Sequence, residues 1–125
     1  MAFVALKPPV TDIFSTAFAL RRAIHKARID ERRNPESARS LVQAADRLVR
    51  IILSRDARGQ ETEHRNLQMY QMNLALRALV YDLFDAGALS DAAADEILAH
   101  SFRFETRHLA RIAAQPDWSS EGSAG

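Results

Sequence analysis

The sequence predicts an all-α protein, specifically an antiparallel up-down-up-down four-helix bundle, and three observations support this. Apolar residues recur at three- and four-residue steps along most of the chain, which is the period of an amphipathic helix. Only 4 Gly and 4 Pro occur among the 125 residues, too few for a turn-rich β-sandwich or barrel. The helix breakers that do occur divide the chain into four helical stretches with short connections, which favour antiparallel neighbours.

The first two helices are predicted at residues 12–32 and 35–58. Thr11 suits the N-cap of the first helix, because the two prolines before it hold the chain extended. Asn34 is a capping residue for the second helix, and Pro35 fits the first helical position. Gly59 is a natural C-terminal stop for this second helix.

The other two helices are predicted at residues 60–86 and 91–114. Gly87 ends the earlier one, Ser90 caps the later one, and Pro116 ends the bundle. The chain is therefore divided into an extended lead at residues 1–10, a four-helix bundle at 11–116 and a tail at 117–125. The tail is small and polar, so we expect it to be disordered.

The helix predicted at residues 60–86 carries two opposed apolar stripes. One stripe contains Leu67, Tyr70, Leu74, Ala78 and Tyr81. A bundle core needs only one stripe, so the second predicts contact with another copy of the chain, unless this helix is simply the most buried of the four. We predict a homo-oligomer whose interface is the opposite stripe, made of Met69, Met72, Leu76, Leu79 and Leu83.

Charge is unevenly distributed although the formal net charge is only +1. Residues 1–60 contain 12 Lys and Arg against 6 Asp and Glu, and residues 61–125 contain 5 against 10. A basic face on the first two helices fits a phosphate backbone, although no aromatic residue for base stacking is evident there. A solvated surface and docking to an acidic partner are the alternatives. The predicted nucleic-acid contacts are Arg22, Lys26, Arg33, Arg39, Arg47, Arg50, Arg55 and Arg58.

Several kinds of chemistry are excluded by composition. The chain has no Cys, which excludes disulfides, Cys-ligated metal sites and thiol catalysis. It has no Gly-rich phosphate loop and no serine in a Gly-flanked turn. No apolar run reaches the roughly 20 residues of a membrane span, and the first ten residues are too short and weakly basic for a signal peptide. We predict a cytoplasmic protein with no membrane contact, no cofactor and no catalytic residue.

Two Glu-x-x-His units, Glu61 to His64 and Glu105 to His108, have the spacing of ligands in ferritin-like di-iron bundles. In an antiparallel hairpin centred near residues 88–89, however, the two histidines lie roughly 7–8 Å apart along the helix axis. We therefore predict no metal site. Glu105 is instead expected to pair with an arginine such as Arg77, or with a tyrosine hydroxyl.

Arg103 and His108 also have the Arg-x4-His spacing found in HEPN ribonucleases, which are small helical bundles. In that interpretation His108 would act as a general acid–base and Arg103 would stabilise charge on a phosphate. The alternative is a surface arginine and a half-buried histidine.

The chain resembles a group of small four-helix-bundle proteins in two stretches. These are LVQAADRLVRIILSRDARG at residues 41–59 and NLALRALVYDLFDAGALSDAAADEILAH at residues 73–100. The group comprises the accessory variability determinant (Avd) proteins of diversity-generating retroelements and the proteins encoded in ribosomal RNA intervening sequences. The likeness spans about residues 38–112 and includes the short turn GALS. It implies a non-enzymatic, ring-like homo-oligomer, pentameric in Avd, that binds a reverse transcriptase and its template RNA.

The leading functional hypothesis is therefore an oligomeric accessory protein that binds RNA, a nucleic-acid enzyme such as a reverse transcriptase, or both. A protein–protein adaptor or inhibitor that binds no nucleic acid is the first alternative. The ribonuclease described above is the second.

Overall fold

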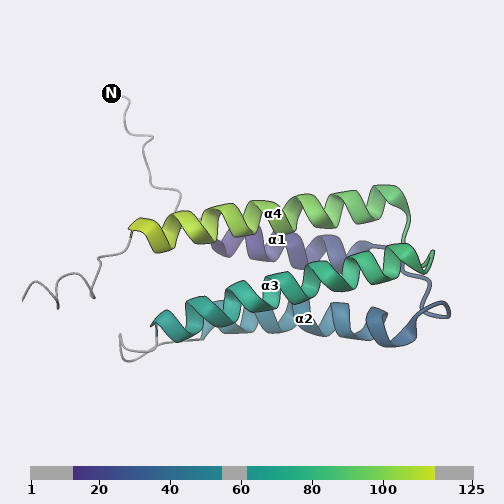
Figure 1. Ribbon diagram of the computed structural model, residues 1–125, viewed down its shortest axis with the longest axis horizontal. Helices are drawn as coiled ribbons and strands as arrows, with labels where there is room; N and C mark the ends of the chain where they lie inside the picture. The colour runs from purple at the N-terminus through teal and green to yellow at the C-terminus, as the bar shows by residue number, and fades with distance from the viewer. Residues whose placement is uncertain (1–12, 55–61, 115–125) are drawn as a thin grey trace, which may run out of the picture.

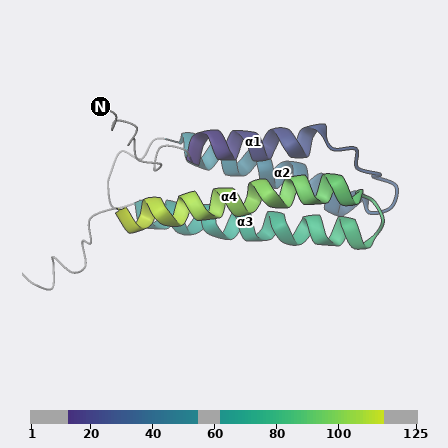
Figure 2. The same cartoon turned by 90° about the horizontal axis from the view of Figure 1, so that it is seen from above.

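The computed structural model describes residues 13–54 and 62–114, which form four α-helices: α1 (Ile13–Lys26), α2 (Pro35–Leu53), α3 (Thr62–Asp85) and α4 (Asp91–Ala114). Successive helices run in opposite directions along one long axis (Figure 1). Helices α1 and α3 each pack against both α2 and α4. Figure 2 shows the four helices lying alongside one another. The predicted all-α four-helix bundle is confirmed.

The core lies along the common axis, where the apolar stripes of the four helices meet. Each helix contributes side chains that are removed from solvent, including Leu20 from α1, Leu41 from α2, Leu76 from α3, and Ile97 and Phe104 from α4. Burial of apolar area stabilises such a fold by roughly 25 cal/mol per Å².

The predicted starts of α2 and α4 are confirmed by their capping hydrogen bonds. Asn34 Oδ1 accepts from the backbone N–H of Ser37 at 3.2 Å, and Pro35 occupies the first helical position. Ser90 Oγ accepts from the backbone N–H of Ala93 at 3.1 Å. Each cap gives a partner to a backbone donor that the first helical turn leaves unpaired.

Helix α1 ends at Lys26, six residues before the predicted end at residue 32. The reason is a turn centred on Asp30, whose carboxylate accepts hydrogen bonds from the Arg32 backbone and from the Arg32 and Arg33 side chains. The backbone N–H of Asp30 donates to the carbonyl of Ala88 at 2.9 Å, which ties this connection to the α3–α4 turn. The hydrogen bond from Asp30 to Ala88 therefore holds this stretch as a turn, at a place where the residue pattern alone would continue the helix.

Helix α2 also ends early, at Leu53 rather than at residue 58. Ser54 has extended backbone angles, and its hydroxyl donates to the carbonyl of Ile51 at 2.7 Å. Helix α3 ends at Asp85, and Gly87 follows with a φ of 72°, the left-handed conformation for which glycine is suited. Thr11, Gly59 and Pro116, the lead at 1–10 and the tail at 117–125 lie outside the described residues.

Candidate functional site

One of the two apolar stripes of α3 faces the core of the bundle. It is the stripe that the sequence predicted as the contact with a second copy, so the placement of that contact is wrong. Met69, Leu76 and Leu83 are 0–2% exposed, and Met72 and Leu79 pack partly buried against the same core. Met69, Leu76 and Leu83 are therefore enclosed by the bundle, and Met72 and Leu79 are covered in part. The stripe that faces solvent is the other one, because α2 and α4 flank α3 and cover only its inner side.

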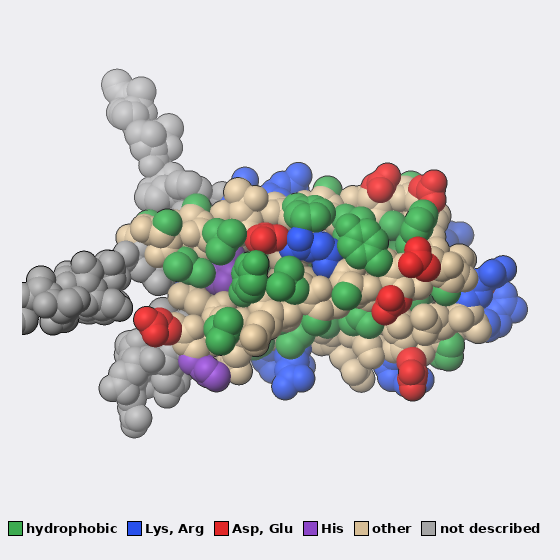
Figure 3. All heavy atoms as spheres, viewed as in Figure 1, with side chains coloured by type: hydrophobic (Ala, Val, Ile, Leu, Met, Phe, Trp, Pro, Cys, Tyr) green, Lys and Arg blue, Asp and Glu red, His purple; other side chains and the backbone are tan. Residues whose placement is uncertain are grey.

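The solvent-facing stripe of α3 continues onto α4 and forms a broad apolar face, which we call the outer α3–α4 surface. Leu67, Leu74 and Tyr81 recur at seven-residue intervals and are 41–52% exposed. Seven-residue spacing on an exposed helix is the pattern that packs against another helix. Figure 3 shows hydrophobic side chains gathered over α3 and α4, with charged groups among them. The large hydrophobic members are Leu67, Tyr70, Leu74, Tyr81 and Phe84 from α3, and Phe102 and Leu109 from α4.

A polar network lies at the centre of this surface and joins α3 to α4. Arg77 stacks over the Phe102 ring at 4.1 Å, forms an ion pair with Glu105, and donates to Ser101 Oγ at 3.2 Å. Ser101 Oγ donates to Asn73 Oδ1 at 2.8 Å, and the Asn73 amide donates to the Ser101 carbonyl at 3.1 Å. The predicted pairing of Glu105 with Arg77 is confirmed. Because both charges are paired, the surface carries apolar area without net charge at its centre.

The ribonuclease interpretation does not fit the geometry of α4. His108 is fully buried, and neither of its ring nitrogens has a hydrogen-bond partner among residues 13–54 and 62–114. Burial, and then the positive charge of Arg111, lower the pKa of His108 below its ordinary value. Arg103 is exposed instead, with its guanidinium 3.3 Å from His100 Nδ1. A general acid–base must reach its substrate, and here His108 is enclosed while Arg103 is exposed, so the two side chains do not share one accessible site.

No metal-binding cluster is present within residues 13–54 and 62–114, where no three His, Asp or Glu side chains converge. Glu61, one member of the first Glu-x-x-His unit, lies outside these residues. In the same ranges no helix has the length and apolar character that a membrane span requires.

The predicted nucleic-acid contacts divide into three groups. Lys26 pairs with Glu96 at 3.0 Å and Arg33 pairs with Asp30 at 3.3 Å, so both charges are partly neutralised. Four arginines of α1 and α2 are exposed and form no ion pair within the described part of the chain: Arg22, Arg39, Arg47 and Arg50. Arg55 and Arg58 lie outside it.

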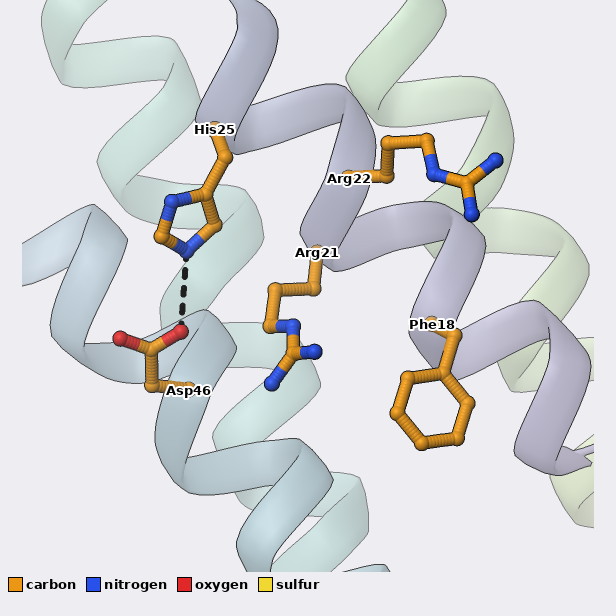
Figure 4. Close-up of a pocket in the computed structure, with 5 residues that line it drawn as sticks. All are labelled: Phe18, Arg21, Arg22, His25 and Asp46. Carbon is orange, nitrogen blue, oxygen red and sulfur yellow. Dashed lines mark hydrogen bonds and ion pairs between the residues drawn. The ribbon is translucent and has the colours of Figure 1, made fainter.

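An open hollow of about 380 Å³ lies on this basic side of the bundle, lined by Phe18, Arg21, Arg22 and His25 from α1 and by Asp46 from α2 (Figure 4). His25 Nε2 lies 2.9 Å from Asp46 Oδ1. Arg21 stacks on the Phe18 ring at 5.3 Å. One aromatic ring thus accompanies the basic face, but Arg21 lies over it, and whether an aromatic residue here stacks on a base stays untested.

Sequence reasoning missed four of these five lining residues, and named only Arg22. The 18, 21, 22, 25 spacing places the α1 members on neighbouring turns of one helix, which the sequence alone could have shown. The fifth member, Asp46, depends on the register between α1 and α2, which no sequence pattern gives.

With this geometry established, the chain was compared with known proteins. No protein-family model, no curated protein and no solved structure matches it. The surfaces themselves are therefore the basis for assigning a function.

Proposed function

We propose that this chain is a non-enzymatic helical-bundle module that self-associates and acts as an accessory protein to RNA or to a nucleic-acid enzyme. The observation that carries the proposal is the outer α3–α4 surface, where Leu67, Leu74, Tyr81, Phe102 and Leu109 are 41–52% exposed on two adjacent helices. Contiguous apolar patches of this kind mark interaction sites on soluble proteins.

A second copy of the chain suits this surface for an electrostatic reason. Arg77 and Glu105 neutralise each other within one molecule, so two such surfaces can meet without burying an unpaired charge. The seven-residue spacing of Leu67, Leu74 and Tyr81 also allows two α3 helices to pack side by side. A two-fold interface uses the same patch on both partners.

Light scattering coupled to size exclusion tests self-association with a matched pair of variants. We expect the wild type to elute as an oligomer and Leu74→Asp to shift towards monomer, because a charge would be buried at the interface. Leu53→Asp is the control, since Leu53 is 56% exposed at the end of α2 and is not one of the residues of the outer α3–α4 surface. A monomeric wild type at high micromolar concentration, or equal effects of the two variants, would overturn the proposal.

RNA binding is the second part of the proposal and is favoured by the four exposed arginines of α1 and α2 that form no ion pair with a described residue. Phosphate contacts release counterions, so affinity should fall with salt at a slope of roughly 0.7 per contact for a single strand. Changing Arg22, Arg39, Arg47 and Arg50 to Glu should lower this slope by about 3, whereas Arg103→Glu on α4 should leave it nearly unchanged. Absent RNA binding in the wild type contradicts this part.

Two further expectations concern the partner. The resemblance implies a reverse transcriptase, and we expect the complex to act in the cytoplasm. If the chain is instead an adaptor without nucleic acid, partner binding should survive the four charge reversals and fail in Leu74→Asp. The core positions Met72 and Leu76 are unsuitable for this test, because they pack inside the bundle.

A further inference from the structure

Arg21 lines the hollow between α1 and α2. Among the described residues it stacks on an aromatic ring and forms no ion pair with a carboxylate. Arg21 is half-buried, and its guanidinium lies 5.3 Å from the centre of the Phe18 ring. Stacking of this kind fixes the plane of the guanidinium and leaves its N–H donors free for a planar or tetrahedral anion. Figure 4 shows Arg21 extending towards α2, beside the His25–Asp46 pair, and Arg22 extending from the other side of α1.

The register of α1 against α2 places a second arginine across from Arg21. The contact between His25 and Asp46, at 2.9 Å, puts these two residues at the same level of two antiparallel helices. Arg21 precedes His25 by four residues and Arg50 follows Asp46 by four. Each step is about 6 Å along its helix axis, in the same direction. Arg21 and Arg50 therefore lie at one level on opposite sides of the groove.

The charges around this position favour an anion. Arg50 and Arg22 are exposed and form no ion pair with any described residue. Asp46 is the single carboxylate among the five side chains that line the hollow, and it is engaged by His25. Arg21 and Arg22 line the hollow, Arg50 follows Asp46 one turn along α2, and the one carboxylate of the lining already has a partner.

We infer that this hollow binds a phosphate group, held between Arg21 of α1 and Arg50 of α2 with Arg22 at its edge. Guanidinium groups donate paired N–H bonds to phosphate oxygens, and two helices supply donors from opposite sides. Phe18 is a positioning residue that holds Arg21 in place. The ligand class is a phosphate monoester or diester, whose oxygens present the same acceptors.

This inference concerns the same α1–α2 surface as the proposed RNA binding, and deepens it by naming one phosphate position. It is nevertheless tested separately, because inorganic phosphate contains no RNA. Titration of the whole chain with inorganic phosphate, followed by amide NMR shifts, should give saturable changes confined to residues 18–25 and 46–50. Saturation here without RNA binding would support the phosphate site and contradict only the RNA proposal.

Four variants separate a defined site from general surface charge. Arg21→Gln should weaken phosphate binding about tenfold, and Arg50→Gln at least about threefold. Arg47→Gln is the matched control, an exposed α2 arginine outside the hollow, and should change affinity by less than about twofold. Asp46→Asn removes the one carboxylate and should strengthen binding. Equal losses in Arg21→Gln and Arg47→Gln, or shifts spread over the whole surface, would overturn the inference.

Oligonucleotides with and without a 5′-phosphate identify the source of the phosphate. Tighter binding of the phosphorylated strand, lost in Arg21→Gln, assigns the site to a monoester. Equal binding of both strands that is weakened by Arg21→Gln assigns it to the backbone diester. Binding of both strands that is unaffected by Arg21→Gln would contradict the inference, and circular dichroism of each variant shows that the bundle remains folded.

Discussion

His108 is fully buried on α4 with its ring centre 5.5 Å from that of Phe104, and no described residue forms a hydrogen bond with either ring nitrogen. Because burial and Arg111 lower its pKa, the folded chain holds His108 neutral at a pH where the unfolded chain, with a pKa near 6.5, already binds a proton. The free energy of unfolding should therefore decrease as the pH falls from about 6.5 to the pKa of His108 in the folded chain. Above about pH 6.5 the contribution of His108 to stability should be constant.

His108→Leu tests this pH dependence. Leucine removes two buried nitrogens that make no hydrogen bonds, so stability at pH 7.5 should change by less than about 1 kcal/mol or increase. Urea unfolding between pH 7.5 and 5 should show a smaller loss of stability in the variant than in the wild type. His64→Gln is the control at an exposed histidine and should keep the wild-type profile. Identical profiles in all three proteins would contradict the assignment.

The Arg77–Glu105 pair is expected to stabilise the α3–α4 contact, because its side chains are only 12% and 22% exposed. Arg77→Met leaves the Glu105 carboxylate without its ion-pair partner and removes one hydrogen bond to the Ser101 hydroxyl, so it should destabilise the fold by about 1–3 kcal/mol. Glu105→Gln should also destabilise it. The double variant should lose less than the two single losses combined, and additive losses in a urea double-mutant cycle would show that the pair is not coupled.

At the scale of a single element, the α3–α4 hairpin depends on Gly87 and Ser90. Gly87 has a φ of 72°, so Gly87→Ala should destabilise the bundle by roughly 1 kcal/mol through backbone strain. A new Cβ would also lie 3.3 Å from the end of the flexible Arg33 side chain, which can move. Gly87→Asn should lose less than Gly87→Ala, since Asn adopts the left-handed conformation more readily. Thermal unfolding of both variants tests this order.

Ser90→Ala removes the hydrogen bond to the Ala93 N–H and should cost about 1 kcal/mol. Ser54→Ala is a useful comparison, because Ser54 lies at the C-terminal end of α2 and its exposed hydroxyl only donates to the Ile51 carbonyl. We expect the Ser54 variant to lose less stability than the Ser90 variant. The reverse order in urea unfolding would show that the α4 cap contributes little.

Helix α3 illustrates why an element can be predicted while its orientation is not. Its start, its end near Gly87 and its helical period follow from local residue order. Its two stripes are similarly apolar, so no amphipathic asymmetry marks the inner one. Only contacts with α2 and α4 distinguish Met69 and Leu76, which are buried, from Leu67 and Leu74, which are exposed. The stripe predicted to be an interface is therefore the one that packs in the core.

At the scale of the whole molecule, the proposed self-association through the outer α3–α4 surface would make apparent stability depend on protein concentration. A ligand that binds only the folded state stabilises it by mass action, and a second copy acts as such a ligand. The thermal midpoint of the wild type should rise with concentration, whereas that of Leu74→Asp should change much less. A wild-type midpoint independent of concentration would indicate a monomer.

The sequence by itself determined the fold class, the caps at Asn34 and Ser90, the turn at Gly87 and the need of Glu105 for a polar partner, with an arginine as one of two candidates. These features depend on local geometry: the 3.6-residue helical period, side chains that bond nearby backbone groups, and a charge placed within an apolar stripe. The ends of α1 and α2 were predicted too late, because the Asp30 turn and the Ser54 cap stop helices that the residue pattern would continue.

Only the tertiary structure decided which stripe of α3 faces solvent, that His108 is enclosed and Arg103 exposed, and that His25 meets Asp46. Each of these depends on the rotation and axial register of one helix against another. Those quantities are set by the packing of all four helices together, since shifting one helix by a single residue rotates every side chain on it by about 100°. The sequence therefore specifies the helices, and their mutual packing specifies which residues are available to a partner.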